Sequence, residues 1–215
     1  MPDGFFDLLG DHAAQWRQRM VRRRFSRDEV IFHEGDAGGS LHVIEKGRVL
    51  VEVSTAKGDV AALAVRGPGD VLGELAIIGD GRRTARVTTL EATETMAMDS
   101  KTLGELRNED PRFDRFLVDL LANKLAEAST QLMEVLFVPV DKRVLRVVDR
   151  LTDSFDNGVT PIVVRIRQED IAAMAGTRRQ TANRPLKMAE AEGAILVRRG
   201  RIDVLDRDLL AQLAR

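Results

Sequence analysis

The chain has 215 residues, of which 44% are hydrophobic and 31% charged, a composition typical of a soluble globular protein with one large or two modest domains. It contains no cysteine, which excludes disulfides, thiolate-held zinc and iron–sulfur centres. No apolar run reaches the roughly 18 residues of a membrane span, and the N-terminus has no secretory signal pattern, so we expect a cytoplasmic protein. The three histidines, His12, His33 and His42, lack the H-x-x-x-H spacing of metal ligands, so no metal site is predicted from them, while haem or a carboxylate-bound metal stays open.

The net charge of −1 hides an asymmetry along the chain. Residues 139–215 hold 15 basic and 11 acidic residues, a net charge of +4, and the other 18 basic and 23 acidic residues give −5. A basic C-terminal third favours a nucleic-acid partner at that end, although such an excess is also common on ordinary surfaces.

Residues 5–20 carry Phe5, Phe6, Leu8, Leu9 and Trp16 and predict a short helical lead-in. Between residues 28 and 99, short β-branched runs alternate with glycine turns, which predicts an antiparallel β sandwich or roll. The predicted strands are 30–32, 41–44, 49–53, 61–65, 87–90 and 93–98.

A helical period begins at Asp110. One apolar stripe has the 3-4 spacing of a coiled-coil seam, and a second stripe lies on other faces. A helix with two apolar faces can pack on its own domain and on a twin, so we expect a homodimer; the alternative is a helix buried within one subunit. The seam contains Val118, Leu121, Leu125, Ala128, Leu132 and Val135, and the second stripe Phe113, Phe116, Leu117, Leu120 and Leu136.

Pro139 ends this helix, residues 137–141 form a hinge, and a helix resumes at Val140. The remaining pattern follows the order of a winged helix-turn-helix. It has a turn at 156–158, a strand at 162–166, helices at 168–175 and 178–192, and a hairpin of 195–197 and 202–205 around Arg199-Gly200-Arg201. The predicted domains are a sensor domain (1–109), a dimerisation helix (110–137) and a DNA-binding domain (138–215).

The most informative segment runs from Gly73-Glu74-Leu75-Ala76 to Arg82-Arg83-Thr84-Ala85. Backbone amides at the start of a short helix attract an anion, and an arginine can clamp a phosphate through paired hydrogen bonds. A carboxylate at that helix start suits a sugar hydroxyl, so the combination indicates a cyclic nucleotide. The alternative for Glu74 and Arg83 is a surface ion pair with helix capping.

This segment resembles the phosphate-binding cassette of cyclic-nucleotide-binding domains, G-E-[LI]-[AG] followed by R-[ATS]-A. The resemblance implies that Glu74 binds the ribose 2′-hydroxyl and Arg83 the cyclic phosphate; Arg82 is the near alternative. Amides around Gly73, Leu75, Ala76 and Thr84 would complete the cradle, with Ala85 as a further ligand-binding residue and Val51 and Ala64 as pocket walls.

The base-reading positions depart from that family. Two adjacent hydroxyl residues on the dimer helix read adenine in the family, and here they align with Ala128 and Ser129, so one hydroxyl is missing. Thr130 lies one step further along the helix, and a step turns a side chain by about 100°. Thr84 resembles the threonine that bonds guanine in cyclic-GMP-binding relatives. Cyclic AMP and cyclic GMP therefore both stay open, and the alternative for Ser129 and Thr130 is solvated surface.

The second informative segment covers residues 168–184. Gly176 permits a tight turn, and Thr177 with Gln180 predicts a capping box, so that a helix begins at Arg178. The predicted exposed face holds Arg178, Arg179, Gln180, Asn183 and Arg184, and Leu186, Met188 and Ala189 are expected to pack. Arginine pairs with guanine, and glutamine or asparagine with adenine, which suits the major groove.

This helix resembles the recognition helix R-E-T-V-x-R of the cyclic AMP receptor family. The match implies guanine contacts by Arg179 and Arg184 and a phosphate contact by Thr181. Gln180 replaces the usual glutamate and could instead only cap the helix, while Pro185 should kink it. The helix at 168 lacks a good cap, because Arg167 stands where a threonine is usual. The alternative for the arginine cluster of this helix is solvated surface. The wing arginines Arg198, Arg199 and Arg201 are expected to touch phosphates rather than bases.

The chain is thus identified as a member of the cyclic AMP receptor and fumarate-nitrate regulator family. The resemblance implies an α+β protein: an antiparallel, jelly-roll-like β-roll, a long dimerisation helix and a winged helix-turn-helix. Its effector would be cyclic AMP or cyclic GMP, switching a homodimer on palindromic double-stranded DNA through the hinge, with RNA polymerase as a further partner. Alternatives are another effector on the same fold, or a signalling module that does not read DNA. No catalytic motif is present, so we expect no enzyme.

Overall fold

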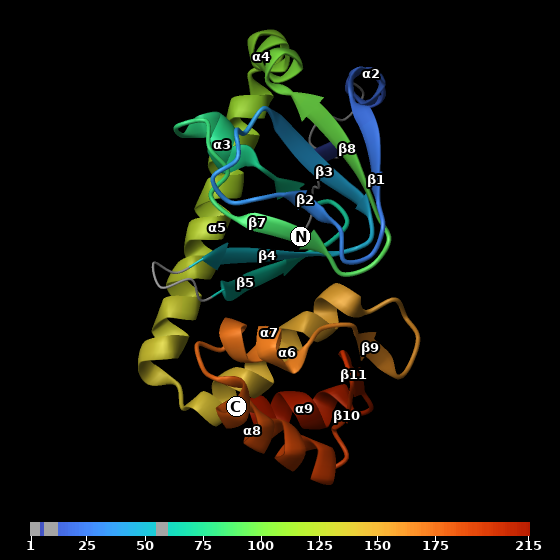
Figure 1. Ribbon diagram of the computed structural model, residues 1–215, viewed down its shortest axis with the longest axis vertical. Helices are drawn as coiled ribbons and strands as arrows, with labels where there is room; N and C mark the ends of the chain where they lie inside the picture. Colours follow the sequence, from blue (N-terminus) through green and yellow to red (C-terminus); the bar gives the residue numbers. More distant parts are fainter. Residues whose placement is uncertain (1–4, 7–12, 55–59) are drawn as a thin grey trace. The chain divides into compact units, whose positions relative to one another are not determined.

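The computed structural model describes residues 5–6, 13–54 and 60–215 (Figure 1). Residue contacts divide the chain into two compact units, one of residues 1–54 and 66–127 and one of residues 55–65 and 128–215. Leu8, Leu9 and His12 of the predicted lead-in lie outside the described residues. Within the described ranges, none of the helices combines the length and apolar character needed to cross a bilayer.

Two four-stranded sheets form the β-roll, confirming that prediction (Figure 1). All six predicted strands are present, and the pairs β1·β8, β8·β3, β3·β6, β2·β7 and β7·β4 are antiparallel. The first sheet has the order β1 (Val21–Phe25), β8 (Thr93–Asp99), β3 (Ser40–Lys46), β6 (Val71–Leu72). The second has the order β2 (Val30–Phe32), β7 (Arg86–Thr89), β4 (Val49–Ser54), β5 (Val60–Arg66).

Two strands and one helix of this unit were not predicted. In β1, Arg22, Arg23 and Arg24 follow one another and are all exposed, so no apolar alternation marks the strand. The strand β6 has only two residues. The helix α4 (Ser100–Glu109) begins where the carboxylate of Asp99 accepts a hydrogen bond from the amide of Thr102 at 2.7 Å. That N-cap is a sequence signal that we did not use.

Helices cover the outer face of the first sheet. Trp16 of α2 (Ala13–Arg19) and Phe113 of α5 (Arg112–Phe137) are buried in one cluster with Leu41 and Met98 of the sheet. A smaller cluster joins the two sheets and includes Val51, the predicted pocket wall. Its buried members are Ile44, Val49, Leu72 and Val87.

The predicted seam of the long helix α5 is exposed within the chain. Leu125 is 69% and Leu132 59% exposed, whereas Phe113 and Leu117 of the second stripe are buried. The seam side chains are therefore not buried within one subunit, and the expectation that a twin covers them stays a prediction.

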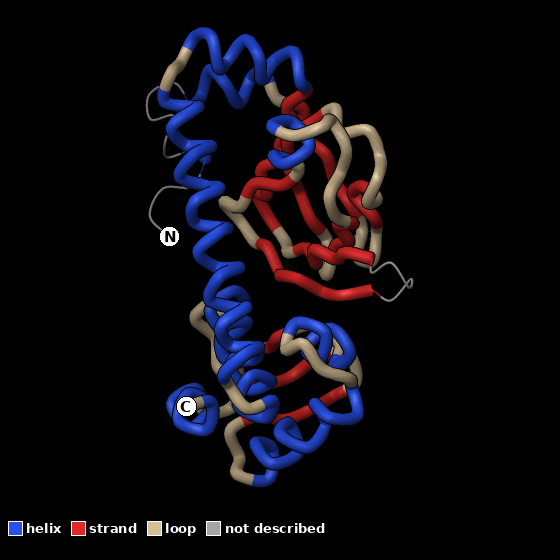
Figure 2. The backbone as a smooth tube through the Cα atoms, turned by 90° about the vertical axis from the view of Figure 1, so that its left-hand side faces the viewer, coloured by secondary structure: helices blue, strands red, loops and turns tan. Residues whose placement is uncertain are grey.

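The second unit has the winged helix-turn-helix order that the sequence predicts (Figure 1). Figure 2 shows the same unit with its helices in blue and its strands in red. Pro139 precedes α6 with a non-helical ψ of 143°. The strand β9 was predicted to reach residue 166 but ends at Val164. The helix α9 was not predicted. The elements are α6 (Val140–Phe155), β9 (Ile162–Val164), α7 (Gln168–Met174), α8 (Arg179–Ala191), β10 (Ile195–Arg198), β11 (Arg201–Val204) and α9 (Arg207–Ala214). The sheet order is β10-β11-β9.

Candidate functional site

A buried arginine dominates the cassette. The side chain of Arg83 is 5% exposed; its Nη1 donates to the carbonyls of Ser40 at 2.8 Å and Gly73 at 3.3 Å, and its Nη2 donates to the Ser40 hydroxyl at 3.0 Å. Its Nε–H is buried and has no acceptor, and no carboxylate of the described residues lies within 4.0 Å of its nitrogens. Burial lowers the pKa of Arg83, and the charges of Asp36 and Glu74 act in the opposite direction. A buried cation with an unused donor is suited to an anionic ligand.

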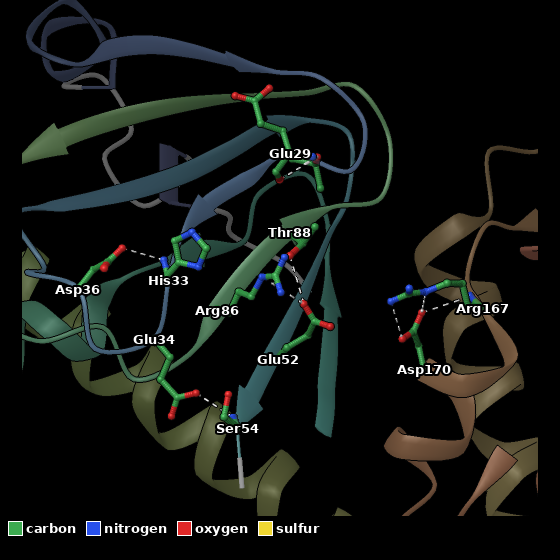
Figure 3. Close-up of polar contacts among 11 residues, drawn as sticks. Glu29, His33, Glu34, Asp36, Glu52, Ser54, Arg86, Thr88, Arg167 and Asp170 are labelled. Atoms are coloured by element: carbon green, nitrogen blue, oxygen red, sulfur yellow. Dashed lines mark hydrogen bonds and ion pairs between the residues drawn. The ribbon is translucent and has the colours of Figure 1, made fainter. Parts of the chain in front are cut away.

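The structure distinguishes Arg83 from its neighbour Arg82. Arg82 is exposed, and its Nη1 donates to the carbonyl of Gly35 at 3.0 Å. The backbone of Arg83 is paired with the loop before β3: its amide donates to the carbonyl of Asp36, and its carbonyl accepts from Gly35, both at 2.8 Å. The loop itself is closed by the Asp36 carboxylate, which accepts from the amide of His33 at 2.9 Å (Figure 3).

The cassette glutamate has a partner that we did not predict. Glu74 begins the short helix α3 (Glu74–Ile78), is 3% exposed, and its Oε1 lies 2.6 Å from Nζ of Lys124 on α5. Glu74 and Arg83 are both buried and do not pair with each other, so the alternative of a surface ion pair between them is wrong. Lys124 lies beside Leu125 of the apolar seam, and nothing in that pattern indicated that its charge would meet the cassette.

The other cassette residues differ in how far they are buried. Gly73 has φ +83°, a conformation that favours glycine, and Nη1 of Arg83 occupies the space of a Cβ there. Ala76 is buried and Ala85 partly buried, whereas Leu75 and Thr84 are exposed. Ser129 and Thr130 are exposed on α5, Ala64 is partly buried on β5, and their roles in ligand binding stay predictions.

The recognition helix starts one residue later than predicted. Helix α8 begins at Arg179, with Arg178 as an N-cap that has no side-chain cap bond, so the capping box of Thr177 and Gln180 is wrong. The reason is the preceding turn: Gly176 has φ +64°, and the amide of Thr177 donates to the carbonyl of Ala172 at 2.9 Å, which holds Thr177 in the turn that follows α7.

The predicted reading face is exposed. Pro185 is buried within α8, which continues to Ala191, whereas Met188 is 44% exposed, contrary to its predicted packing. The exposed residues include Arg178, Arg179, Gln180, Thr181, Asn183 and Arg184, while Leu186 and Ala189 are buried as predicted.

The start of helix α7 is better capped than the sequence predicts. Arg167 is its N-cap residue and makes no side-chain cap bond of the usual kind. Instead, the carboxylate of Asp170 accepts from the Arg167 backbone amide at 3.4 Å and from its Nε at 2.9 Å (Figure 3). A carboxylate at the third helical position thus closes this helix start.

Carboxylates also hold several of the arginines that were expected to meet DNA. Arg184 pairs with Asp141 at the start of α6. On the wing, Arg198 lies 2.8 Å and Arg201 3.1 Å from the buried carboxylate of Asp203. Arg199, beside the turn at Gly200, is exposed.

One arginine joins the hinge to the turn of the helix-turn-helix. The guanidinium of Arg143 on α6 donates to the carbonyls of Val135 at 3.1 Å and Val138 at 3.0 Å. It also donates to Ala175 at 2.9 Å and Gly176 at 3.4 Å. The predicted hinge is therefore bonded to the turn before the recognition helix through one side chain.

Comparisons with known proteins agree with this arrangement. Residues 22–110 match the family model of the cyclic nucleotide-binding domain, and residues 142–213 match that of the Crp-like helix-turn-helix domain. The chain is 31% identical to the cyclic AMP receptor protein of Thermus thermophilus, over 90% of this chain and 88% of that protein. It is 29% identical to a CRP-like cAMP-activated global transcriptional regulator of Mycobacterium tuberculosis, over 89% of this chain and 87% of the relative.

Two solved structures illustrate the shared fold. The catabolite activator protein of Thermus thermophilus superposes with a TM-score of 0.55 at 28% identity, covering 96% of this chain and 97% of its own. CLP of Xanthomonas campestris, a regulator described as c-di-GMP responsive, has a TM-score of 0.75 at 20% identity and covers 89% of this chain and 97% of its own. With both domains matched in order and a relative above 30% identity, the chain belongs to the CRP family of cyclic-nucleotide-binding transcription regulators.

Proposed function

We propose that this chain is a homodimeric transcription regulator whose DNA binding is switched by cyclic AMP, with cyclic GMP as the second candidate effector. The observation that carries the proposal is the buried guanidinium of Arg83, which has an unused Nε–H and no carboxylate of the described residues within 4.0 Å. Such a group is stabilised by an anion, and the cyclic phosphate supplies one negative charge with two exocyclic oxygens.

Glu74 is the proposed acceptor for the ribose 2′-hydroxyl. Its carboxylate also pairs with Lys124, so a ligand bound to Glu74 changes the surroundings of a charge on α5. That helix continues to Phe137, the first residue of the predicted hinge. The side chain of Arg143 bonds this hinge to the turn of the helix-turn-helix. We infer that the nucleotide acts through α5 on the two recognition helices, and the coupling is reciprocal, because DNA must then tighten nucleotide binding by the same factor.

The proposed DNA contacts are the exposed polar side chains of α8. Arg179 and Arg184 would bind guanines, and Thr181 a phosphate, with Arg178, Gln180 and Asn183 beside them. The exposed seam of α5 is the proposed dimer interface, because Leu125 and Leu132 would otherwise remain in water. A two-fold dimer predicts a palindromic operator with half-sites about 34 Å apart. RNA polymerase is the proposed further partner, as the family resemblance implies.

The preference for cyclic AMP rests on two relatives, a cyclic AMP receptor protein and a CRP-like cAMP-activated global transcriptional regulator. The likeness to a c-di-GMP responsive regulator is at 20% identity and concerns the fold. Thr84 is exposed in the cassette and supports keeping cyclic GMP as the second candidate.

The test begins with selection of duplexes from a random pool by the purified protein in the presence of cyclic AMP. Fluorescence anisotropy then measures the affinity for the selected site with and without nucleotide. We expect binding to tighten at least about tenfold with nucleotide, a coupling of about 1.4 kcal/mol. Arg83→Ala should lose this response, whereas the matched exposed neighbour Arg82→Ala should keep it. Equal affinity in the presence and absence of cyclic AMP and cyclic GMP would overturn the switch.

A further inference from the structure

A chain of hydrogen bonds, part-buried at Ser40 and buried at His42, leads away from Arg83 into the first sheet. The hydroxyl of Ser40, which accepts from Nη2 of Arg83, lies 3.0 Å from Nε2 of His42. The other ring nitrogen of His42, Nδ1, lies 3.0 Å from Oγ1 of Thr95 on β8. Ser40 and His42 are two residues apart on β3, so their side chains share one face of the strand. His42 is 8% exposed and Thr95 fully buried.

The direction of these bonds follows from the donors available. A guanidinium can only donate, so the Ser40 oxygen accepts from Arg83. If the Ser40 hydroxyl donates to Nε2 of His42, then Nδ1 carries the ring proton and donates to Thr95, and each donor from Arg83 to His42 along the chain meets one acceptor. The reverse tautomer would point two donors at the Ser40 oxygen and leave its hydroxyl proton without that acceptor. We therefore assign the proton to Nδ1 of His42.

The histidine stays neutral in this environment. Burial is the largest cause that lowers the pKa of His42, to about 4, and the charges of Arg83 and Arg23 add to the effect. The rings of Phe25 and Phe32 lie 6.5 Å and 6.2 Å from the imidazole. A neutral imidazole keeps Nε2 as an acceptor at every pH near neutrality, so the orientation of the Ser40 hydroxyl is fixed.

The bonds to Ser40 and Gly73 leave the N–H groups on one edge of the Arg83 guanidinium without an acceptor in the described part of the chain. Nη1 uses both hydrogens, on the carbonyls of Ser40 and Gly73, and Nη2 uses one, on the Ser40 hydroxyl. The remaining N–H groups, those of Nε and the second of Nη2, lie along the same edge of the planar group, and neither has an acceptor among the described residues. Two parallel donors on one edge match two oxygens of a phosphate.

We propose that Ser40, His42 and Thr95 form a positioning relay that fixes the rotation of the Arg83 guanidinium, so that its Nε–Nη2 edge faces the cyclic phosphate. The inference rests on the proposed nucleotide site and adds the residues that set its geometry. None of the three needs to touch the ligand. His42 holds the Ser40 hydroxyl, and Ser40 holds Arg83 through both its carbonyl and its hydroxyl.

If the relay positions Arg83, variants that break it should discriminate less between the two diastereomers of a phosphorothioate nucleotide. A general loosening of the fold predicts no such loss. The Rp and Sp phosphorothioates of cyclic AMP differ only in which exocyclic oxygen is sulfur, so their affinity ratio reports the orientation of the guanidinium. Calorimetry of the full-length protein should show a clear preference for one diastereomer. Ser40→Ala and His42→Phe should bind cyclic AMP about tenfold more weakly and bring the Rp/Sp ratio toward one.

Two controls separate the relay from stability. Ser100→Ala removes an exposed hydroxyl elsewhere in this unit and should leave affinity and ratio unchanged. His42→Gln offers an amide oxygen to Ser40 and an amide N–H to Thr95, so it should restore part of the ratio that His42→Phe loses. Nitrogen NMR of the wild-type protein should show His42 with the proton on Nδ1.

The outcomes are distinguishable. If the wild-type protein binds cyclic AMP and its phosphorothioates but Ser40→Ala and His42→Phe keep the wild-type affinity and ratio, the relay is wrong and the nucleotide site stands. A proton on Nε2 of His42 would also overturn the relay. If the wild-type protein binds neither cyclic AMP, cyclic GMP nor the phosphorothioates, the proposed nucleotide site fails, and the relay fails with it.

Discussion

A methyl group added to Gly73 would overlap Nη1 of Arg83 and would lie 2.9 Å from the carbonyl oxygen of Ser40. Gly81 has the same φ of +83° but nothing within 4 Å of an added Cβ. Both Gly→Ala changes therefore cost the left-handed backbone penalty of about 1–2 kcal/mol, and only Gly73→Ala also displaces Arg83. We expect Gly73→Ala to lower the free energy of unfolding by at least about 1 kcal/mol more than Gly81→Ala. We also expect Gly73→Ala to weaken nucleotide binding and Gly81→Ala to leave it unchanged. Equal unfolding curves and equal affinities would contradict this reading.

The Lys124–Glu74 pair should matter for both stability and ligand binding. Lys124→Met leaves the buried carboxylate of Glu74 without its cation, which costs free energy. Because Lys124 is 27% exposed, we expect a moderate loss of about 1–2 kcal/mol in urea unfolding, and weaker nucleotide binding because Lys124 no longer holds the Glu74 carboxylate in place. The control is Arg115→Met on the same helix, where the pair with Asp119 is exposed and should contribute less than about 0.5 kcal/mol. Similar losses in both variants would argue against a special role for Lys124.

The bonds of Arg143 should stabilise the junction between α5 and the helix-turn-helix. Arg143→Lys keeps the charge but cannot reach four carbonyls, so we expect a loss of about 1–3 kcal/mol in unfolding free energy. Arg150→Lys is the control, because Arg150 bonds a single carboxylate, that of Glu134. The two variants should differ in chemical denaturation, and the account of the junction fails if they unfold alike.

Asp141 should compete with DNA for Arg184. If Arg184 contacts the operator, it must give up its pair with Asp141, so Asp141→Asn should tighten operator binding several-fold. The matched control is Asp153→Asn, which removes the same charge from another surface pair, that with Arg207. Anisotropy with the selected duplex measures both. If the two variants gain affinity for the duplex equally, the gain is a general effect of charge. The proposal that Arg184 contacts a base would then be wrong.

His42 should give the protein a specific sensitivity to acid. Burial lowers the pKa of His42 from 6.5 to about 4, so the unfolded chain binds a proton between these values and the folded chain does not. The stability contributed by neutral His42 is thus fully present above pH 6.5 and is lost progressively down to about pH 4. The difference is about 3 kcal/mol. Urea unfolding at pH 7 and pH 4 should show a larger loss for the wild-type protein than for His42→Phe, and identical losses would contradict the assignment.

The domain order could be predicted because each part carries a local signal. The glycine turns between β-branched runs indicated the roll, and the seam containing Leu125 and Leu132 indicated the long helix. The strand β1 was missed because Arg22, Arg23 and Arg24 show no alternation. The wrong start of α8 has a different cause: capping residues were judged from spacing, while the actual boundary depends on the turn at Gly176.

The partners within the site could not be predicted from the sequence. The cassette pattern singled out Glu74 and Arg83, but Lys124 reaches Glu74 across 50 residues of sequence. The contact of His42 with Thr95 depends on the register of β3 against β8, in which His42 is opposite Ala97 and Thr95 opposite Ile44, so that the two side chains are diagonal neighbours. The pairs Lys124–Glu74 and His42–Thr95 depend on tertiary packing and strand register, which no local sequence pattern specifies.

Isothermal titration of the purified wild-type protein with cyclic AMP and with cyclic GMP, repeated with Arg83→Ala, tests whether Arg83 holds a cyclic nucleotide. We expect micromolar or tighter binding of one nucleotide and its loss in Arg83→Ala, because the phosphate supplies a counter-charge to the buried guanidinium. Absence of binding for both nucleotides, or equal affinity in Arg83→Ala, would contradict this expectation.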